Sequence, residues 1–143
     1  MLTLPQTAEY ALRAVYFIAE APQESPINVA AIAGGLRVPR NYLSKTLHQL
    51  VRAGILQSTR GPAGGFRLAR PADRITLGEV VRPFMPSEGR ACVLGRGMCS
   101  DVAPCAAHHR WRVAAERMRS FFSETTIADL VAGAATSAAR QTA

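Results

Sequence analysis

The chain has 143 residues, 48% hydrophobic and 19% charged, a composition that supports a folded core and excludes an intrinsically disordered protein. No apolar run approaches the roughly 18 residues of a membrane span, and the first residues lack a secretory signal pattern, so we expect a cytoplasmic protein. The net charge is +7. The whole excess lies within residues 30–75, where eight basic residues accompany a single acid, Asp73. Such a block is typical of a nucleic-acid-binding surface, although a solvated basic face is the alternative.

Three helical segments are predicted in the first third of the chain. Residues 7–21 carry apolar side chains at helical spacing on one face. Asn28 can cap a short helix from Val29 to about Gly34, followed by a turn at Gly34–Gly35. A longer helix is predicted over residues 39–53. Two short helices, a tight turn and a longer helix with a polar face are the pattern of a helix-turn-helix.

A β-hairpin is predicted directly after these helices. Ile55–Ser58 reads as a short strand, Thr59–Gly65 as a loop rich in turn residues, and Phe66–Arg70 as a strand that alternates apolar and basic residues. An ordinary hairpin without a ligand would give the same pattern. The arginine at its tip favours a wing that reaches into a DNA groove.

The second half of the chain is predicted to hold helices around a long loop. Thr76–Glu79 has the spacing of a capping box and opens a helix over about 77–82. A long helix at 105–122 carries a heptad-like apolar stripe that includes Trp111 and Phe121. Thr126 can cap a last short helix. The predicted fold class is mostly α with a small β-hairpin wing, divided into a DNA-binding domain at 1–84, a cysteine loop at 85–104, a dimerisation helix with a short C-terminal helix at 105–132 and a disordered tail at 133–143.

Three cysteines and a histidine lie close together in the sequence. Cys92, Cys99, Cys105 and His108 could supply four metal ligands, and an odd number of cysteines argues against a disulfide framework. Gaps of six and five residues are wider than the knuckles that usually hold structural zinc. The spacing therefore favours an iron–sulfur cluster, with zinc or a metal-free thiol switch as alternatives.

Motifs of common enzyme sites are absent from the sequence. There is no phosphate-binding glycine loop, no G-x-S-x-G, no H-E-x-x-H and no recognisable pair of catalytic carboxylates. We therefore expect a protein that is not an enzyme. An electron carrier that uses a cluster is a further alternative, but it would have no need of a concentrated basic block or a wing.

Several short motifs together resemble the Rrf2 family of small transcription regulators, which includes an iron–sulfur cluster regulator and a nitric-oxide-sensing repressor. The resemblance covers residues 1 to about 132 and depends on the order and spacing of its parts. These parts are Thr7–Ala14, Tyr42-Leu43, Arg60–Phe66, Leu77–Val81, the cysteine loop, Trp111 and Thr126–Val131.

The resemblance implies a winged-helix homodimer in which the helix at 105–122 pairs with its mate. It also implies that Cys92, Cys99 and Cys105 bind an iron–sulfur cluster. His108 matches the fourth ligand of one family branch and favours a [2Fe–2S] cluster over [4Fe–4S]. Glu9 matches the position from which a partner subunit supplies a carboxylate ligand in another branch. The expected function is a repressor that senses nitric oxide, redox conditions or iron–sulfur status.

A DNA-binding surface follows from the helix-turn-helix and the wing. The third helix would enter the major groove, the arginine at the wing tip would reach the minor groove, and flanking arginines would neutralise phosphates. A dimer would then read a palindromic operator. The candidate residues are Arg37, Arg40, Asn41, Tyr42, Ser44, Lys45, Arg60, Gly61, Arg67 and Arg70.

Overall fold

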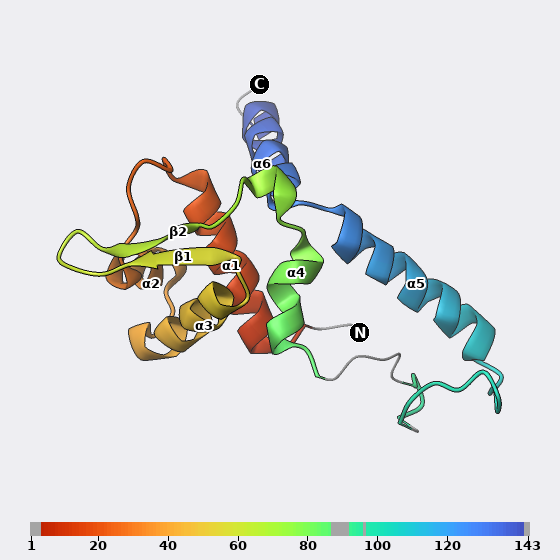
Figure 1. Ribbon diagram of the computed structural model, residues 1–143. Coiled ribbons are helices and arrows are strands. Elements are labelled where there is room, and N and C mark those ends of the chain that lie inside the picture. Colours follow the sequence, from red (N-terminus) through yellow and green to blue (C-terminus); the bar gives the residue numbers. More distant parts are fainter. Residues whose placement is uncertain (1–3, 87–91, 96, 142–143) are drawn as a thin grey trace.

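The computed structural model describes residues 4–86, 92–95 and 97–141, and it has the predicted mostly α-helical fold with a hairpin wing (Figure 1). The helices and strands follow in the order α1 (Gln6–Glu20), α2 (Val29–Leu36), α3 (Arg40–Arg52), β1 (Leu56–Thr59), β2 (Gly65–Leu68), η1 (Ala72–Arg74), α4 (Leu77–Val81), η2 (Arg82–Phe84), α5 (His108–Glu124) and α6 (Ile127–Gln141). No helix in these ranges is long and apolar enough to cross a bilayer.

Helix α1 forms the centre of the winged domain. Its buried face consists largely of small residues, Ala8, Ala11 and Ala14, together with Val15 and Ile18. Small side chains let neighbouring elements approach closely, and α1 contacts α2, α3, α4, α6 and β2. The core around it therefore fixes the orientation of α3 and the wing relative to α1.

The turn between α2 and α3 differs from the prediction. Asn28 caps α2 as expected, but the helix continues through Gly34 and Gly35. The chain reverses instead at Arg37, which has a left-handed backbone with φ 55°. A Cβ on Gly35 would come within 2.5 Å of the Phe17 ring. This glycine therefore leaves room for the Phe17 ring where α2 packs on α1, and it does not form the turn.

The wing is a two-stranded antiparallel hairpin that is anchored to the α1–α2 loop. Leu56 pairs with Leu68 at its base. The Phe66 backbone N–H donates to the Ile27 carbonyl over 2.8 Å, and the Ile27 N–H donates to the Phe66 carbonyl over 2.9 Å. A Cβ on Gly65 would collide with the Ile27 carbonyl. Glycine at this position therefore permits the contact that ties the wing to the body.

Two capping boxes meet where α4 and α6 begin. The Thr76 N–H donates to Glu79 over 2.9 Å, and the Glu79 N–H donates to the Thr76 hydroxyl over 3.2 Å. Thr126 and Asp129 repeat this arrangement at α6, and Thr76 and Thr126 form an antiparallel bridge. The backbone N–H of Thr76 holds the pKa of Glu79 below its ordinary value, with help from the Arg70 guanidinium. The junction joins the winged domain to the C-terminal helices.

Helix α5 leaves the winged domain as a projecting arm (Figure 1). Its C-terminal end packs against α4, where the Phe122 backbone lies over Gly78, but none of its residues is buried. The next helix, α6, runs to Gln141, so residues 133–141 are helical where a disordered tail was predicted. The residues after Gly133 include many alanines, which have the highest helix propensity, and they outweigh that single glycine.

Candidate nucleic-acid interface and cysteine loop

Helix α3 buries one face and exposes the other. Leu43, Leu47 and Leu50 are fully buried in the core, and this periodicity turns the opposite face outward. Arg40, Asn41 and Lys45 are exposed on that face and Ser44 is partly exposed. The predicted recognition helix therefore presents its polar residues to solvent, as a helix that enters the major groove must.

Tyr42 links the exposed face of α3 to α1. Its ring meets the Tyr10 ring edge-to-face with centroids 5.6 Å apart. The Arg13 guanidinium lies 5.8 Å from the centre of the Tyr10 ring and donates to the Leu36 carbonyl over 2.9 Å. Tyr10 and Arg13 thus support α3 and the end of α2. No local sequence pattern indicated these contacts, because they cross between helices.

Exposed cations surround α3 and the wing. Among the residues that the structure describes, these cations form no ion pair, so their charge is available to a ligand. A hollow of about 450 Å³ lies between α3 and the wing, lined by Ser44, His48 and Arg60 among others. Gly61, at the wing tip, has φ 102°. The exposed cations are Arg37, Arg40, Lys45, Arg52 and Arg60.

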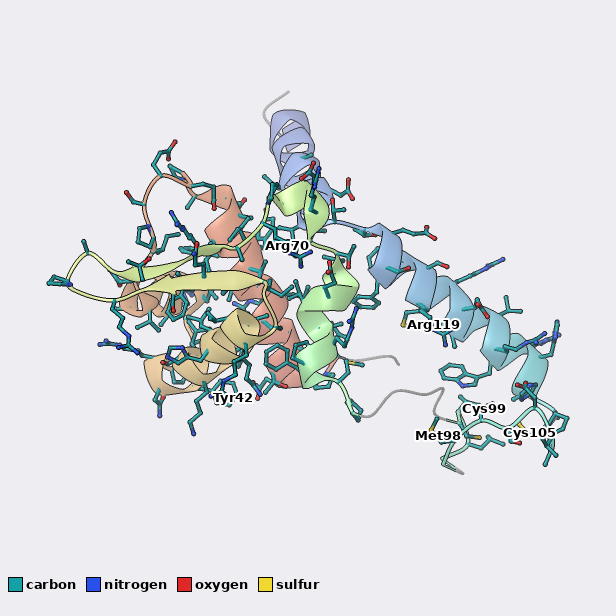
Figure 2. The ribbon with its side chains drawn as sticks, in the orientation of Figure 1. Tyr42, Arg70, Met98, Cys99, Cys105 and Arg119 are labelled. Atoms are coloured by element: carbon teal, nitrogen blue, oxygen red, sulfur yellow. The ribbon has the colours of Figure 1, made fainter. Side chains whose placement is uncertain are left out.

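Two of the predicted phosphate-binding arginines have partners within the protein. The Arg67 guanidinium donates across the hairpin to the Gln57 side chain over 3.1 Å. This contact keeps the Arg67 side chain on the wing. Arg70 donates to Glu79 over 3.1 Å and to the Arg74 carbonyl over 3.0 Å. Figure 2 places Arg70 at the side of the winged domain opposite Tyr42. Arg70 therefore braces the α4 capping box and does not join the exposed cations around α3.

The cysteine loop lies at the far end of α5, away from the wing (Figure 2). Cys92, Cys99 and Cys105 are half-buried, and none of the three forms a disulfide. The Cys92 N–H donates to the Gly97 carbonyl over 2.7 Å, and the Gly95 N–H donates to the Cys92 carbonyl over 2.9 Å. The chain around Cys92 thus forms a small closed turn.

His108 connects the loop to the first turn of α5. Its Nδ1 lies 3.3 Å from the Cys99 Sγ, and its Nε2 lies 2.7 Å from Asp101 Oδ1. The backbone N–H of His108 donates to the Cys105 carbonyl over 2.9 Å. Within the described ranges, no three His, Cys, Asp or Glu side chains gather closely enough to hold one metal ion. The structure therefore brings Cys99 and His108 together, but within these ranges it does not gather a set of three or more ligands.

Glu9, the other predicted fourth ligand, is part of the winged domain. It is exposed on α1, with Oε1 3.8 Å from Arg13 Nη1, and α1 lies apart from the cysteine loop of the same chain (Figure 1). His109 is exposed beside His108. Sequence reasoning missed Asp101, because its contact with His108 spans seven residues of irregular loop.

The match to a known family decides the class of protein. A family described as an iron-dependent transcriptional regulator, Rrf2, matches residues 4–133. The chain belongs to the Rrf2 family. A protein of Aquifex aeolicus named "Putative HTH-type transcriptional regulator" is 35% identical over 128 residues, which cover 87% of this chain and 88% of that protein. The regulator IscR of Vibrio atlanticus is 31% identical over 130 residues, 91% of this chain and 75% of that one.

Solved structures agree with this assignment. The structure titled CymR, the global cysteine regulator of B. subtilis, superimposes with a TM-score of 0.77 at 25% identity, covering 92% of this chain and 98% of that one. This Rrf2 protein is therefore a helix-turn-helix transcriptional regulator with DNA as its partner, and not an enzyme. The predicted family, fold class and regulator class are confirmed.

Proposed function

We propose that this Rrf2 protein is a repressor whose DNA binding depends on an iron–sulfur cluster held by Cys92, Cys99 and Cys105. The observation that carries the proposal is the approach of His108 Nδ1 to within 3.3 Å of the Cys99 Sγ. Two donors on one tetrahedral metal, with bonds of about 2.3 Å to sulfur and about 2.0 Å to nitrogen as at zinc, lie about 3.5 Å apart. The observed distance between Cys99 Sγ and His108 Nδ1 is close to this value without a metal.

The same pair favours a [2Fe–2S] cluster with His108 as the fourth ligand. Each iron of a two-iron cluster takes two protein ligands, whereas each iron of a four-iron cluster takes one. A thiol and an imidazole 3.3 Å apart suit one iron of the smaller cluster. Three thiols and one imidazole also match the donors that iron–sulfur centres use. Ligation by Glu9 of the partner subunit is the alternative, since Glu9 is exposed on α1.

The DNA interface consists of the exposed face of α3 and the wing. Arg40 and Asn41, in the first turn of α3, can make bidentate contacts to guanine and adenine edges in the major groove. Arg60 at the wing tip reaches the minor groove, and Arg37 and Arg67 neutralise phosphates. The absence of competing ion pairs at Arg37, Arg40 and Arg60 in the described part of the chain supports this assignment.

A second copy of the chain covers the projecting helix α5. The helix has no buried residue, yet Phe121 is 53% exposed and Val113 is 40% exposed. Exposed apolar surface of this kind gains free energy when a partner removes it from water. Pairing two α5 helices places two α3 helices on one duplex, so the operator is palindromic, with half-sites about one helical turn or a multiple of it apart.

The cysteine loop couples sensing to DNA binding through its position. It connects the winged domain to α5, and His108 joins it to the first turn of that helix. When bound, the cluster supplies a group that nitric oxide and oxidants attack. Cys99 and His108 would hold this group and so tie the loop to the first turn of α5. Without the group the loop would no longer be tied to α5, and the two winged domains would be held differently relative to each other. The signal is thus nitric oxide, redox state or iron–sulfur supply.

The visible absorption spectrum of anaerobically purified protein, with iron, sulfide and zinc assayed on the same sample, tests this proposal. We expect a coloured protein with about equal iron and sulfide, and a colourless Cys99→Ser variant. A colourless wild-type chain that also fails to take up ferrous iron and sulfide would refute it.

A metal-free thiol switch is the second candidate function. The contact between Cys99 and His108 also suits a reactive cysteine, since a neighbouring imidazole activates thiols. Reversible oxidation that changes DNA affinity in iron-free protein would favour this candidate. Bound zinc with unchanged DNA affinity after chelation would instead indicate a structural metal.

A further inference from the structure

His108 is held on both edges of its ring. Nδ1 faces the Cys99 Sγ at 3.3 Å, and Nε2 faces Asp101 Oδ1 at 2.7 Å. The His108 side chain is 12% exposed and that of Asp101 is 71% exposed. The carboxylate therefore reaches from the loop surface to a largely buried imidazole.

The 2.7 Å contact defines the tautomer of the ring. A carboxylate oxygen can only accept a hydrogen bond, so Nε2 carries the proton that it donates to Asp101. In the neutral imidazole Nδ1 then bears the lone pair, and this lone pair points toward Cys99. Histidines that bind metals usually donate the other ring N–H to a carboxylate or a carbonyl, which fixes the ring orientation and raises the basicity of the ligating nitrogen.

We propose that Asp101 is a positioning residue for the cluster: it holds His108 so that Nδ1, rather than Nε2, is the ligating nitrogen. The inference depends on the proposed cluster function. Asp101 itself touches neither iron nor DNA in this account. Its backbone is held by the turn in which the Val102 N–H donates to the Ser100 hydroxyl over 3.1 Å, so the carboxylate approaches His108 from a defined position.

Ligation through Nε2 would need a different ring position. His108 would have to give up the Asp101 contact and turn a ring that is only 12% exposed. Nδ1 would also move away from Cys99. The observed rotamer avoids both changes, because the nitrogen that faces the thiol is the one that bears the lone pair in the neutral ring.

Variants at Asp101 separate its charge from its hydrogen bond. Asp101→Asn keeps an oxygen that accepts from Nε2 but loses the charge, whereas Asp101→Ala loses both. Asp73→Ala is the matched control, because Asp73 is an exposed acid on η1. Each protein is loaded anaerobically with ferrous iron and sulfide, and the rate of cluster loss to a chelator is measured. We expect the rate to rise about 10- to 100-fold in Asp101→Ala, less in Asp101→Asn and not in the control.

Isotope labelling identifies the ligating nitrogen directly. Wild-type protein is prepared with ¹⁵N at histidine Nδ1 only, and the reduced cluster is studied by hyperfine electron paramagnetic resonance. The chain has three histidines, so His108→Ala assigns the signal. We expect strong ¹⁵N coupling from Nδ1 in wild type and in Asp101→Asn, and a weakened or heterogeneous coupling in Asp101→Ala.

The possible failures are distinguishable. Strong coupling from Nε2, or a cluster with no histidine coupling, would overturn the role of Asp101 and leave the cluster function intact. Equal chelator rates in wild type and Asp101→Ala would do the same. A wild-type chain that takes up no cluster would overturn this inference together with the proposed function.

Discussion

Replacing Arg60 by alanine should weaken operator binding without weakening the fold. Arg60 is exposed at the wing tip and forms no ion pair within the described residues, so its removal breaks no structural contact. In the minor groove Arg60 lies between the two phosphate backbones, where its charge displaces counterions as a phosphate contact does. Each charge neutralised in this way adds about 0.9 to the salt slope, which corresponds to about 1 kcal/mol of counterion release at about 0.15 M salt. A dimer loses two such contacts, so the Kd should rise about 30-fold and the slope of log K against log salt should flatten by about 1.8.

Arg70→Ala is the matched control for this prediction. The Arg70 guanidinium donates to Glu79 and to the Arg74 carbonyl, and its side chain is 39% exposed. Removing it should lower the free energy of unfolding by about 1 kcal/mol or less and leave the salt slope unchanged. Fluorescence anisotropy on an operator selected from a random-sequence pool, at several salt concentrations, measures both variants. A flattened slope in Arg70→Ala, or an unchanged slope in Arg60→Ala, would refute the assignment of the interface.

Further variants test the fold and the dimer. Thr76→Ala removes one side of a capping box and should cost about 1 kcal/mol of stability, measured by urea unfolding. Glu79→Gln should be less stable than wild type at pH 7, and this difference in stability should shrink as the pH falls through the lowered pKa of Glu79. The reason is that a carboxyl with a depressed pKa stabilises the fold above its unfolded pKa of about 4.3, and this stabilisation is lost below its folded pKa. A constant difference down to pH 2 would contradict the capping role. Phe121→Asp should raise the dimer dissociation constant at least tenfold, measured by analytical ultracentrifugation. If the variant keeps the dimer mass at low protein concentration, α5 does not form the dimer interface. Gly65→Val should lower both stability and operator affinity, since any Cβ there collides with the Ile27 carbonyl; a native-like melting temperature would argue against that contact.

Features with a local sequence signature were predictable. The capping box of Thr76 and Glu79 and the cap at Asn28 depend on side chains three residues from the groups they contact. The hairpin was predicted because a loop rich in turn residues stands between two short strand patterns, the second of which alternates apolar and basic residues. The polar face predicted for the longer helix of the helix-turn-helix corresponds to the exposed face of α3.

Features that depend on contacts between distant elements were not predictable. Gly35 was interpreted as a turn residue, and only the packing of Phe17 shows why it is a glycine. Arg70 belongs to the basic block by sequence, but the fold places it beside Glu79. The contact of Asp101 with His108 lies in a loop with no periodicity, so no spacing rule identifies it. Local pattern thus predicts elements and caps, whereas the partner of a long polar side chain depends on the tertiary fold.

The central claim is that the cluster controls DNA binding. The most direct test is the Kd of wild-type protein for a selected operator, measured first with the cluster loaded and then after its anaerobic removal from the same sample. Coupling free energies between linked sites are typically about 1–3 kcal/mol, so we expect the two values to differ by about 5- to 150-fold, and the Cys99→Ser variant to match the cluster-free protein. Equal affinities of the two forms would contradict the account and leave a DNA-binding regulator without a cluster switch.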